Sequence, residues 1–120
     1  AKIMSFRFRN FKVYQDAKLL HKEIVVLVNT FTRNYWYLSD QMKRSSLSIV
    51  LNIAEGSSKQ SDKDFNRYIA ISLGSVDEMV ASLEIAFDQK LLSKEKLTYF
   101  QNCHESLSKQ LGGFSKFLKS

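Results

Sequence analysis

Residues 38–56 form the segment that most constrains how this chain can fold. At about 100° per residue, a helix over this range carries its polar groups on one narrow stripe. The stripe consists of Gln41, Arg44, Ser48, Asn52 and Glu55. Apolar residues cover an arc of about 200°, roughly twice the width that a surface helix needs. This helix must therefore be covered on two sides, and one cover can be another subunit.

The composition favours long helices over sheets. The 120 residues include no proline and four glycines, too few turn residues for hairpins or a β-sandwich. The length fits a single domain spanning residues 1–120. The single cysteine, Cys103, cannot form an internal disulfide, which indicates a reducing compartment. No apolar run approaches the ~18 residues of a membrane span, and no secretory signal is evident. We therefore expect a cytoplasmic protein without membrane association.

Apolar residues at three- and four-residue steps predict four helices. The first covers residues 11–32. The second is capped by Ser39 or Asp40 and ends at Gly56, a residue that tolerates the left-handed cap conformation. Ser61 and Ser93 are expected to cap the third and fourth helices. Residues 1–10 are expected to form an N-terminal arm and residues 114–120 a loose tail after the glycine pair 112–113. The predicted fold is all-α, an antiparallel up-and-down four-helix bundle.

Gly74 lies inside the predicted third helix. A glycine in a helix interior costs about 1 kcal/mol relative to alanine. We expect the close approach of another helix to compensate for this cost.

The polar stripe has two interpretations. It can be a solvated face, or it can be buried against a neighbour. Each unpaired buried polar group would then cost about 1–3 kcal/mol, so its partners would fix helix register and subunit geometry. A catalytic use of Glu55 is disfavoured, because no second carboxylate or histidine is placed beside it in the sequence.

The remaining chemistry-bearing residues predict no catalytic site. His104 lies on the apolar seam of the fourth helix and is expected to be a core or interface histidine. Two histidines and one cysteine, without H-x-x-x-H or C-x-x-C spacing, do not predict a metal site. No nucleotide-binding or nucleophile motif occurs. The sequence therefore predicts no enzymatic activity, no metal and no cofactor.

The charge distribution suggests an anionic partner. The net charge is +6, with basic ends around an acidic middle, which fits nucleic acid but also an ordinary excess of lysine. Arg7, Arg9 and Lys12 alternate with phenylalanines. This pattern can stack bases and bind phosphates, or the phenylalanines can dock an arm onto the bundle. The candidate nucleic-acid-binding residues are Arg7, Arg9, Lys12, Lys18, Lys59 and Arg67.

Several motifs resemble one known family. They are Phe8-Arg-Asn-Phe-Lys-Val-Tyr-Gln-Asp-Ala17, Gln41-Met-x-Arg44, Ser48-Ile-x-x-Asn52-Ile-Ala-Glu-Gly56, Ser61-Asp-Lys-x-Phe65 and Gly74-Ser75-x-x-Glu78. The chain is similar in these motifs to four-helix-bundle proteins encoded in 23S ribosomal RNA intervening sequences, also labelled S23 ribosomal proteins. It departs from the family pattern at Tyr14, Val50 and Ser72, where Trp, Pro and Ala are usual.

This resemblance implies a ring of identical subunits, a homopentamer, without enzymatic activity. Related accessory proteins of diversity-generating retroelements look like pentameric barrels that bind nucleic acid and a reverse transcriptase. The motif residues Gly56, Gly74 and Ser75 join the polar stripe as expected structural and oligomerisation residues. We therefore expect a non-catalytic homo-oligomeric scaffold that binds RNA or DNA through a basic surface. The alternative is a protein–protein interaction scaffold without nucleic-acid binding.

Overall fold

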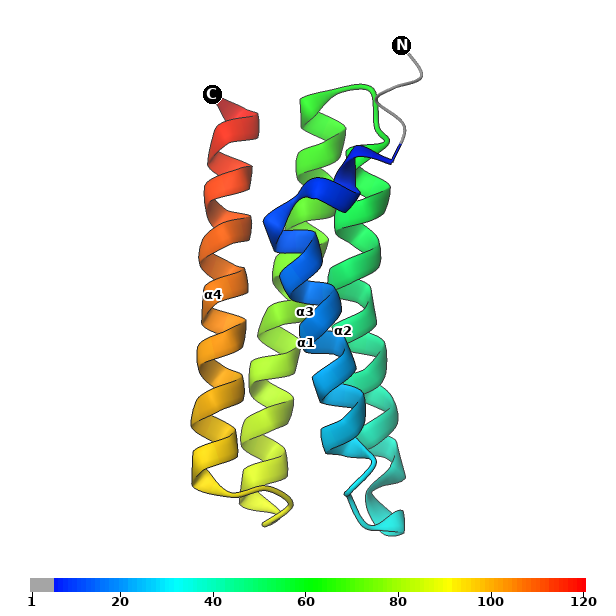
Figure 1. Cartoon of the computed structure of the whole chain (residues 1–120), viewed down its shortest axis with the longest axis vertical. Helices are drawn as coiled ribbons and strands as arrows, with labels where there is room; N and C mark the ends of the chain where they lie inside the picture. Colours follow the sequence, from blue (N-terminus) through cyan, green and yellow to red (C-terminus); the bar gives the residue numbers. More distant parts are fainter. Residues whose placement is uncertain (1–5) are drawn as a thin grey trace.

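The computed structural model describes residues 6–120, which fold into an antiparallel bundle of four α-helices (Figure 1). The helices are α1 (Lys12–Val28), α2 (Trp36–Ser57), α3 (Asp62–Asp88) and α4 (Lys94–Lys119). Two short 3₁₀ helices, η2 (Arg7–Asn10) and η3 (Arg33–Tyr35), precede α1 and α2. Each helix packs against the next along the chain, whereas α1 and α4 contact each other much less. The all-α four-helix bundle that the sequence predicts is confirmed.

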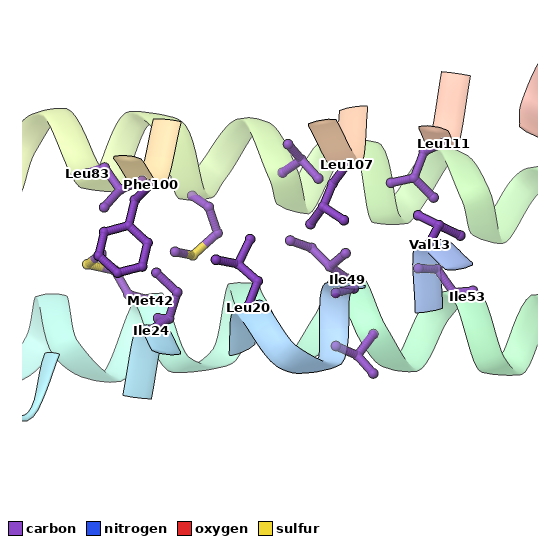
Figure 2. Packing of buried hydrophobic residues seen from close by; sticks show 14 of the residues in the cluster. Val13, Leu20, Ile24, Met42, Ile49, Ile53, Leu83, Phe100, Leu107 and Leu111 are labelled. Carbon is purple, nitrogen blue, oxygen red and sulfur yellow. The ribbon is translucent and has the colours of Figure 1, made fainter. Parts of the chain in front are cut away.

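Apolar side chains from all four helices fill the interior of the bundle. Figure 2 shows Ile24 of α1, Met42 of α2, Leu83 of α3 and Phe100 of α4 pointing into one shared core. The first three of these side chains are completely buried. Burying a side chain of this size contributes about 1.5–3 kcal/mol, so the core is the main source of stability.

The first helix is shorter than the sequence suggests. It ends at Val28 rather than near residue 32. The hydroxyl of Thr30 donates a 2.6 Å hydrogen bond to the Leu27 carbonyl, and Ser39 donates to the Val28 carbonyl at 3.2 Å. These side chains satisfy the last carbonyls of α1, which have no partner within the helix.

The second helix is longer at both ends than predicted. It begins at Trp36, so Ser39 and Asp40 lie inside it and the predicted cap at either residue is wrong. Ser39 instead contacts the end of α1. At the other end α2 continues through Gly56 to Ser57, and Gly56 keeps a right-handed helical backbone instead of the predicted left-handed cap.

The predicted starts of α3 and α4 are confirmed. Ser61 accepts a hydrogen bond from the backbone N–H of Asp64 at 3.1 Å. Ser93 accepts one from the N–H of Lys96 at 3.2 Å. Such side-chain caps satisfy N–H groups that the first helical turn leaves unpaired.

The predicted loose tail at residues 114–120 is wrong. Helix α4 continues through both glycines to Lys119, and Leu118 is buried. The ring of Phe114 lies 5.3 Å from that of Phe11 and 5.1 Å from that of Phe65, measured between centroids. This aromatic packing outweighs the helix-breaking preference of the two glycines, a cost of about 1 kcal/mol each. Within the predicted arm, residues 1–5 lie outside the described residues, and 7–10 form η2.

Candidate oligomerisation and nucleic-acid-binding surfaces

The middle of the predicted polar stripe lies against α3. The Asn52 amide donates hydrogen bonds to the Ser48 carbonyl at 2.9 Å and to the Ser48 hydroxyl at 3.1 Å. The hydroxyl of Ser75, in α3, donates to the same Ser48 hydroxyl at 2.8 Å. All three residues are at least half-buried. These polar groups therefore find partners within their own chain, and the partners fix the register of α2 on α3.

A second group of hydrogen bonds continues this contact along α2. The Gln41 amide donates to the Ser45 hydroxyl at 3.1 Å, and Ser45 donates to the Glu78 carboxylate of α3 at 3.4 Å. Gln41 itself is exposed, whereas Ser45 is buried. Gln41 therefore forms the solvent-facing end of a polar contact between α2 and α3.

Arg44 and Glu55 belong to the solvated part of the stripe. The Arg44 guanidinium donates to the Asp40 carboxylate at 2.9 Å, and both side chains are exposed. The Glu55 carboxylate lies 3.9 Å from the Lys59 ammonium. Exposed ion pairs of this kind contribute about 0–1 kcal/mol, so neither residue is needed for the fold of the single chain.

Gly56 lies at a close contact between α2 and α3. A Cβ atom at Gly56 would lie 2.7 Å from the Cβ of Tyr68 and 2.9 Å from Cδ1 of Phe65. Nearby, the buried hydroxyl of Ser72 donates to the Ile49 carbonyl at 3.0 Å. Small residues thus let the two helix backbones come together, and Gly56 serves this packing rather than ending the helix.

Sequence reasoning missed most of the buried serines. They are Ser45, Ser46, Ser57, Ser72, Ser75 and Ser82. Serine is normally an exposed residue, so it gives no apolar signal at a buried helix position. A cluster of serines on the inner faces of two consecutive predicted helices is the signal that could have found this contact.

Gly74 does not contact another helix of this chain, contrary to our expectation. A Cβ atom there would meet no atom within 4 Å. The residue lies on the exposed outer face of α3. Its cost to the helix therefore has no compensation within the chain.

The wide apolar arc of α2 is divided between the core and the surface. Met42, Val50 and Ile53 are buried inside the bundle. Leu47 and Leu51, one helical turn apart, are 41% and 53% exposed. The chain thus covers one flank of the arc and leaves the other flank open.

A groove lies between α1 and α4, which are the least closely packed pair of neighbouring helices. Its volume is about 440 Å³, and its apolar lining includes Leu19, Val26 and Phe100, with Lys22 and Lys96 beside them. A hollow of about 200 Å³ adjoins it and shares Leu19 with it. In this second hollow the Tyr99 hydroxyl donates to the Glu23 carboxylate at 2.6 Å, and this contact raises the pKa of Tyr99.

Arg7 has a structural role. Its guanidinium donates two hydrogen bonds to the Ser57 carbonyl, from Nε at 3.2 Å and from Nη2 at 3.1 Å, and lies 5.5 Å from the centroid of the Phe65 ring. It therefore caps the C-terminal end of α2. The ring of Phe8 packs edge-on against Tyr14 at 4.8 Å between centroids. The arm docks onto the bundle, as the second interpretation of the alternating pattern expects.

Four of the other predicted cations come from the same end of the bundle as Arg7. Arg9 lies in η2, Lys12 starts α1, Lys59 follows α2 and Arg67 lies near the start of α3. Lys12 pairs with Asp16, Arg67 with Asp64 at 3.0 Å, and Lys59 with Glu55. Lys18 lies farther along α1, about 9 Å from Lys12 at 1.5 Å per residue, and its ammonium is 5.5 Å from the centroid of the Tyr14 ring.

Three lysines at this end were not among the predicted candidates. Lys63 is in the first turn of α3, and Lys116 and Lys119 are in the last turn of α4. All three are exposed, and none forms an ion pair within residues 6–120. Lys116 and Lys119 were not candidates because residues 114–120 were expected to form a loose tail. We call the following set the basic end: Arg9, Lys12, Lys59, Lys63, Arg67, Lys116 and Lys119.

Both histidines are held by hydrogen bonds within the bundle. His104 is fully buried, Nδ1 contacts the Phe100 carbonyl at 2.7 Å, and burial lowers its pKa. This confirms the predicted core histidine. His21 contacts the Ser46 hydroxyl, and burial lowers its pKa as well. Across the described part of the chain, no three His, Cys, Asp or Glu side chains are placed to share a metal ion.

None of the helices within residues 6–120 combines the length and the hydropathy that crossing a bilayer requires.

Comparison with known proteins identifies relatives of the chain. A family model described as 23S rRNA-intervening sequence protein matches residues 9–113. Among solved structures, the chain is similar to a protein of unknown function from the S23 ribosomal protein family of Bacteroides thetaiotaomicron VPI-5482. The TM-score is 0.81 at 25% sequence identity, with 87% of this chain and 95% of the other covered. None of the curated proteins matches the sequence.

Proposed function

Because the chain belongs to the family of 23S rRNA-intervening sequence proteins, as its motifs predicted, we propose that it acts as a non-catalytic homo-oligomeric scaffold. In this proposal the assembled scaffold binds RNA or DNA through the basic end of each bundle. The observation that carries the proposal is the apolar surface that the folded chain leaves uncovered.

This apolar surface occurs on several helices. Val26 of α1 is 66% exposed and Ile71 of α3 is 50% exposed, in addition to Leu47 and Leu51 of α2. Leu47 and Leu51 lie one turn apart on one flank of α2, and adjoining exposed apolar side chains of this kind mark interaction sites. Association of identical chains would remove these side chains from water, and the family resemblance puts the number of subunits at five.

The basic end supports the nucleic-acid part of the proposal. Residues from η2, α1, α3, α4 and the segment after α2 bring its cations together at one end of the bundle (Figure 1). Assembly multiplies the net charge of +6 per chain by the number of subunits. Lysines and arginines that neutralise phosphates release counterions, so such binding weakens steeply as salt increases.

The histidines support a structural rather than a catalytic role. His104 is enclosed in the core, and His21 is bonded to the buried Ser46. A general acid or base needs access to the proton that it transfers. These two side chains serve the packing of the helices instead.

A protein–protein interaction scaffold without nucleic-acid binding is the second candidate. It is favoured by the partners that the predicted cations already have. Arg7 is occupied by the Ser57 carbonyl, and Lys12 and Arg67 lie beside carboxylates of their own helices. The apolar surface would then serve other proteins, such as a reverse transcriptase, as well as assembly.

Binding measured against salt separates the two candidates. The mass of the assembly is determined by light scattering, and its affinity for RNA and duplex DNA is then measured from about 50 mM salt upward. We expect an oligomer whose nucleic-acid affinity falls steeply with salt. An oligomer that binds neither nucleic acid at the lowest salt would favour the second candidate, and a monomer would refute the scaffold.

A matched pair of variants locates the binding surface. The first carries Lys63→Glu, Lys116→Glu and Lys119→Glu at the basic end. The second carries Arg33→Glu, Lys90→Glu and Lys94→Glu at the opposite end of the bundle. Both triple changes lower the net charge by the same amount. If the basic end binds the nucleic acid, only the first should abolish binding. Equal losses would show that net charge, rather than the basic end, governs the affinity.

A further inference from the structure

We propose that the outer face of α3 in one copy docks into the α1–α4 groove of the next copy. This inference rests on the proposed homo-oligomer and specifies which surfaces form it. The two surfaces are different parts of one chain's exterior. Such a head-to-tail contact builds rings or open filaments instead of two-fold dimers.

The groove offers an apolar floor with basic neighbours. Leu19 and Val26 are 59% and 66% exposed along it. Lys22 and Lys96 stand on its two sides, from α1 and α4, and both are exposed. Glu23 is half-buried and accepts the hydrogen bond from Tyr99. The groove therefore fits a ridge that carries both apolar and acidic side chains.

The outer face of α3 has these properties. Ile71 and Ile85 are both about half exposed, and Ala81 lies between them on the same side of the helix. At about 100° per residue, Glu78 lies between Ile71 and Ile85 on this face, and the carboxylates of Asp77, Glu84 and Asp88 line one edge of it. Residues 68–89 contain no lysine or arginine. The charge of this face is thus opposite to that of the two lysines at the groove.

The exposed face of α3 is at least as long as the groove. Residues from Ile71 to Ile85 span about 21 Å of helix at 1.5 Å per residue. The α1 residues that line the groove and its adjoining hollow run from Asp16 to Leu27, about 17 Å of helix. One helix face can therefore fill the groove along its whole length.

Docking would explain Gly74. This residue lies between Ile71 and Ile85 on the exposed side of α3, and a Cβ there would meet nothing in its own chain. A residue without a side chain lets the backbone of a second helix approach closely. In the docked pair that second helix is α1 or α4 of the neighbouring copy.

Charge reversal tests the contact. One variant carries Lys22→Glu and Lys96→Glu, and a second carries Asp77→Lys and Glu84→Lys. All four positions are exposed, so circular dichroism should show an unchanged fold. Each pair places like charges across the interface and should raise the concentration needed for assembly at least about tenfold. The chain that carries all four changes restores opposite charges and should assemble as the original chain does.

Cross-linking tests the same contact without altering any charge. Val26 and Ile85 lie at the same level of the bundle, two residues beyond Ile24 and Leu83 in Figure 2. In a Cys103→Ser background, Val26→Cys alone and Ile85→Cys alone should give monomers after mild oxidation. Both changes in one chain should give a ladder of linked subunits, because each groove then faces a neighbour's α3. A disulfide-linked dimer from either single variant would indicate a two-fold contact and would refute the proposal.

The outcomes also distinguish this inference from the proposed function. An oligomer that withstands both reversals and gives no ladder overturns the interface while the scaffold stands. The interface is also overturned if the variant with all four charge changes does not assemble and the double-cysteine variant gives no ladder. A monomeric original chain overturns both proposals.

Discussion

The hydroxyl of Ser75 in α3 donates a 2.8 Å hydrogen bond to the hydroxyl of Ser48 in α2. Ser48 also accepts from Asn52, so one hydroxyl joins the inner side of the polar stripe to the next helix. A net contribution of about 0.5–1.5 kcal/mol is usual for such a bond. Its position at the contact between the two helices makes it a determinant of their register.

Ser48→Ala and Ser75→Ala should therefore be coupled. Each change alone should lower the free energy of unfolding by about 1 kcal/mol, and the double variant should lose less than the sum because both remove the same bond. Urea denaturation of the four chains measures the coupling. Ser48→Ala combined with Ser108→Ala, on α4, is the control and should be additive; additive losses for the first pair would contradict the assigned contact.

Gly56→Ala should destabilise the bundle by about 1–3 kcal/mol, the usual cost of overpacking. The new methyl group would lie 2.7 Å from the Tyr68 Cβ, so α2 and α3 would have to separate. Gly112→Ala, where no atom lies within 4 Å, should instead stabilise α4 by up to about 1 kcal/mol. Thermal unfolding of both variants checks this opposition, and equal effects would show that the packing at Gly56 is not tight.

Arg7→Met should lower the free energy of unfolding by about 1.5–3 kcal/mol, because two hydrogen bonds from a charged group to the Ser57 carbonyl are lost. Methionine keeps much of the aliphatic length. Arg9→Met removes the same charge from an exposed position and should change stability by less than about 0.5 kcal/mol. If the two variants unfold at the same urea concentration, Arg7 is a surface cation without a capping role.

Stability should decrease as the pH falls below about 6.5. Burial lowers the pKa of His104 from its ordinary value of 6.5, so the unfolded chain takes up a proton before the folded chain does. Its contribution is fully present above pH 6.5 and is lost as the pH decreases toward the folded pKa, by up to about 1.4 kcal/mol per pH unit.

Urea denaturation of the original chain and of His104→Leu between pH 5 and 8 measures this dependence. The leucine variant should show a shallower slope, and His21→Gln should retain most of the original slope because His21 is only half-buried. An unchanged slope in His104→Leu would assign the pH dependence to other groups.

The apolar periodicity was sufficient to predict the fold, because residues such as Ile24, Met42 and Leu83 lie in the core at the expected helical steps. The ends of the helices were harder to predict. Ser39 looks like a cap for α2 but bonds to the end of α1, a contact between residues 11 positions apart. Phe114 holds the end of α4 in place through Phe11 and Phe65, which are distant in sequence.

The candidate surfaces were predicted in part. The wide apolar arc indicated that one bundle would not cover the whole of this helix, and Leu47 and Leu51 are the arc residues that stay exposed. The partners of Ser48 and Asn52 could not be chosen from the sequence, because a polar group does not show whether it bonds within a chain or between chains. Arg7 illustrates the same limit, since its charge suggests a phosphate and its contacts are with Ser57 and Phe65.

The serine-rich contact between α2 and α3 has a consequence for the motions of the protein. Small side chains bring these two helices together over most of their length, whereas α1 and α4 face each other across an open groove. The α2–α3 hairpin should therefore be the most rigid part of the molecule, with the slowest amide hydrogen exchange. Helices α1 and α4 can then shift relative to each other without disturbing the α2–α3 contact. This freedom would let the groove change its width to fit the helix that docks in it.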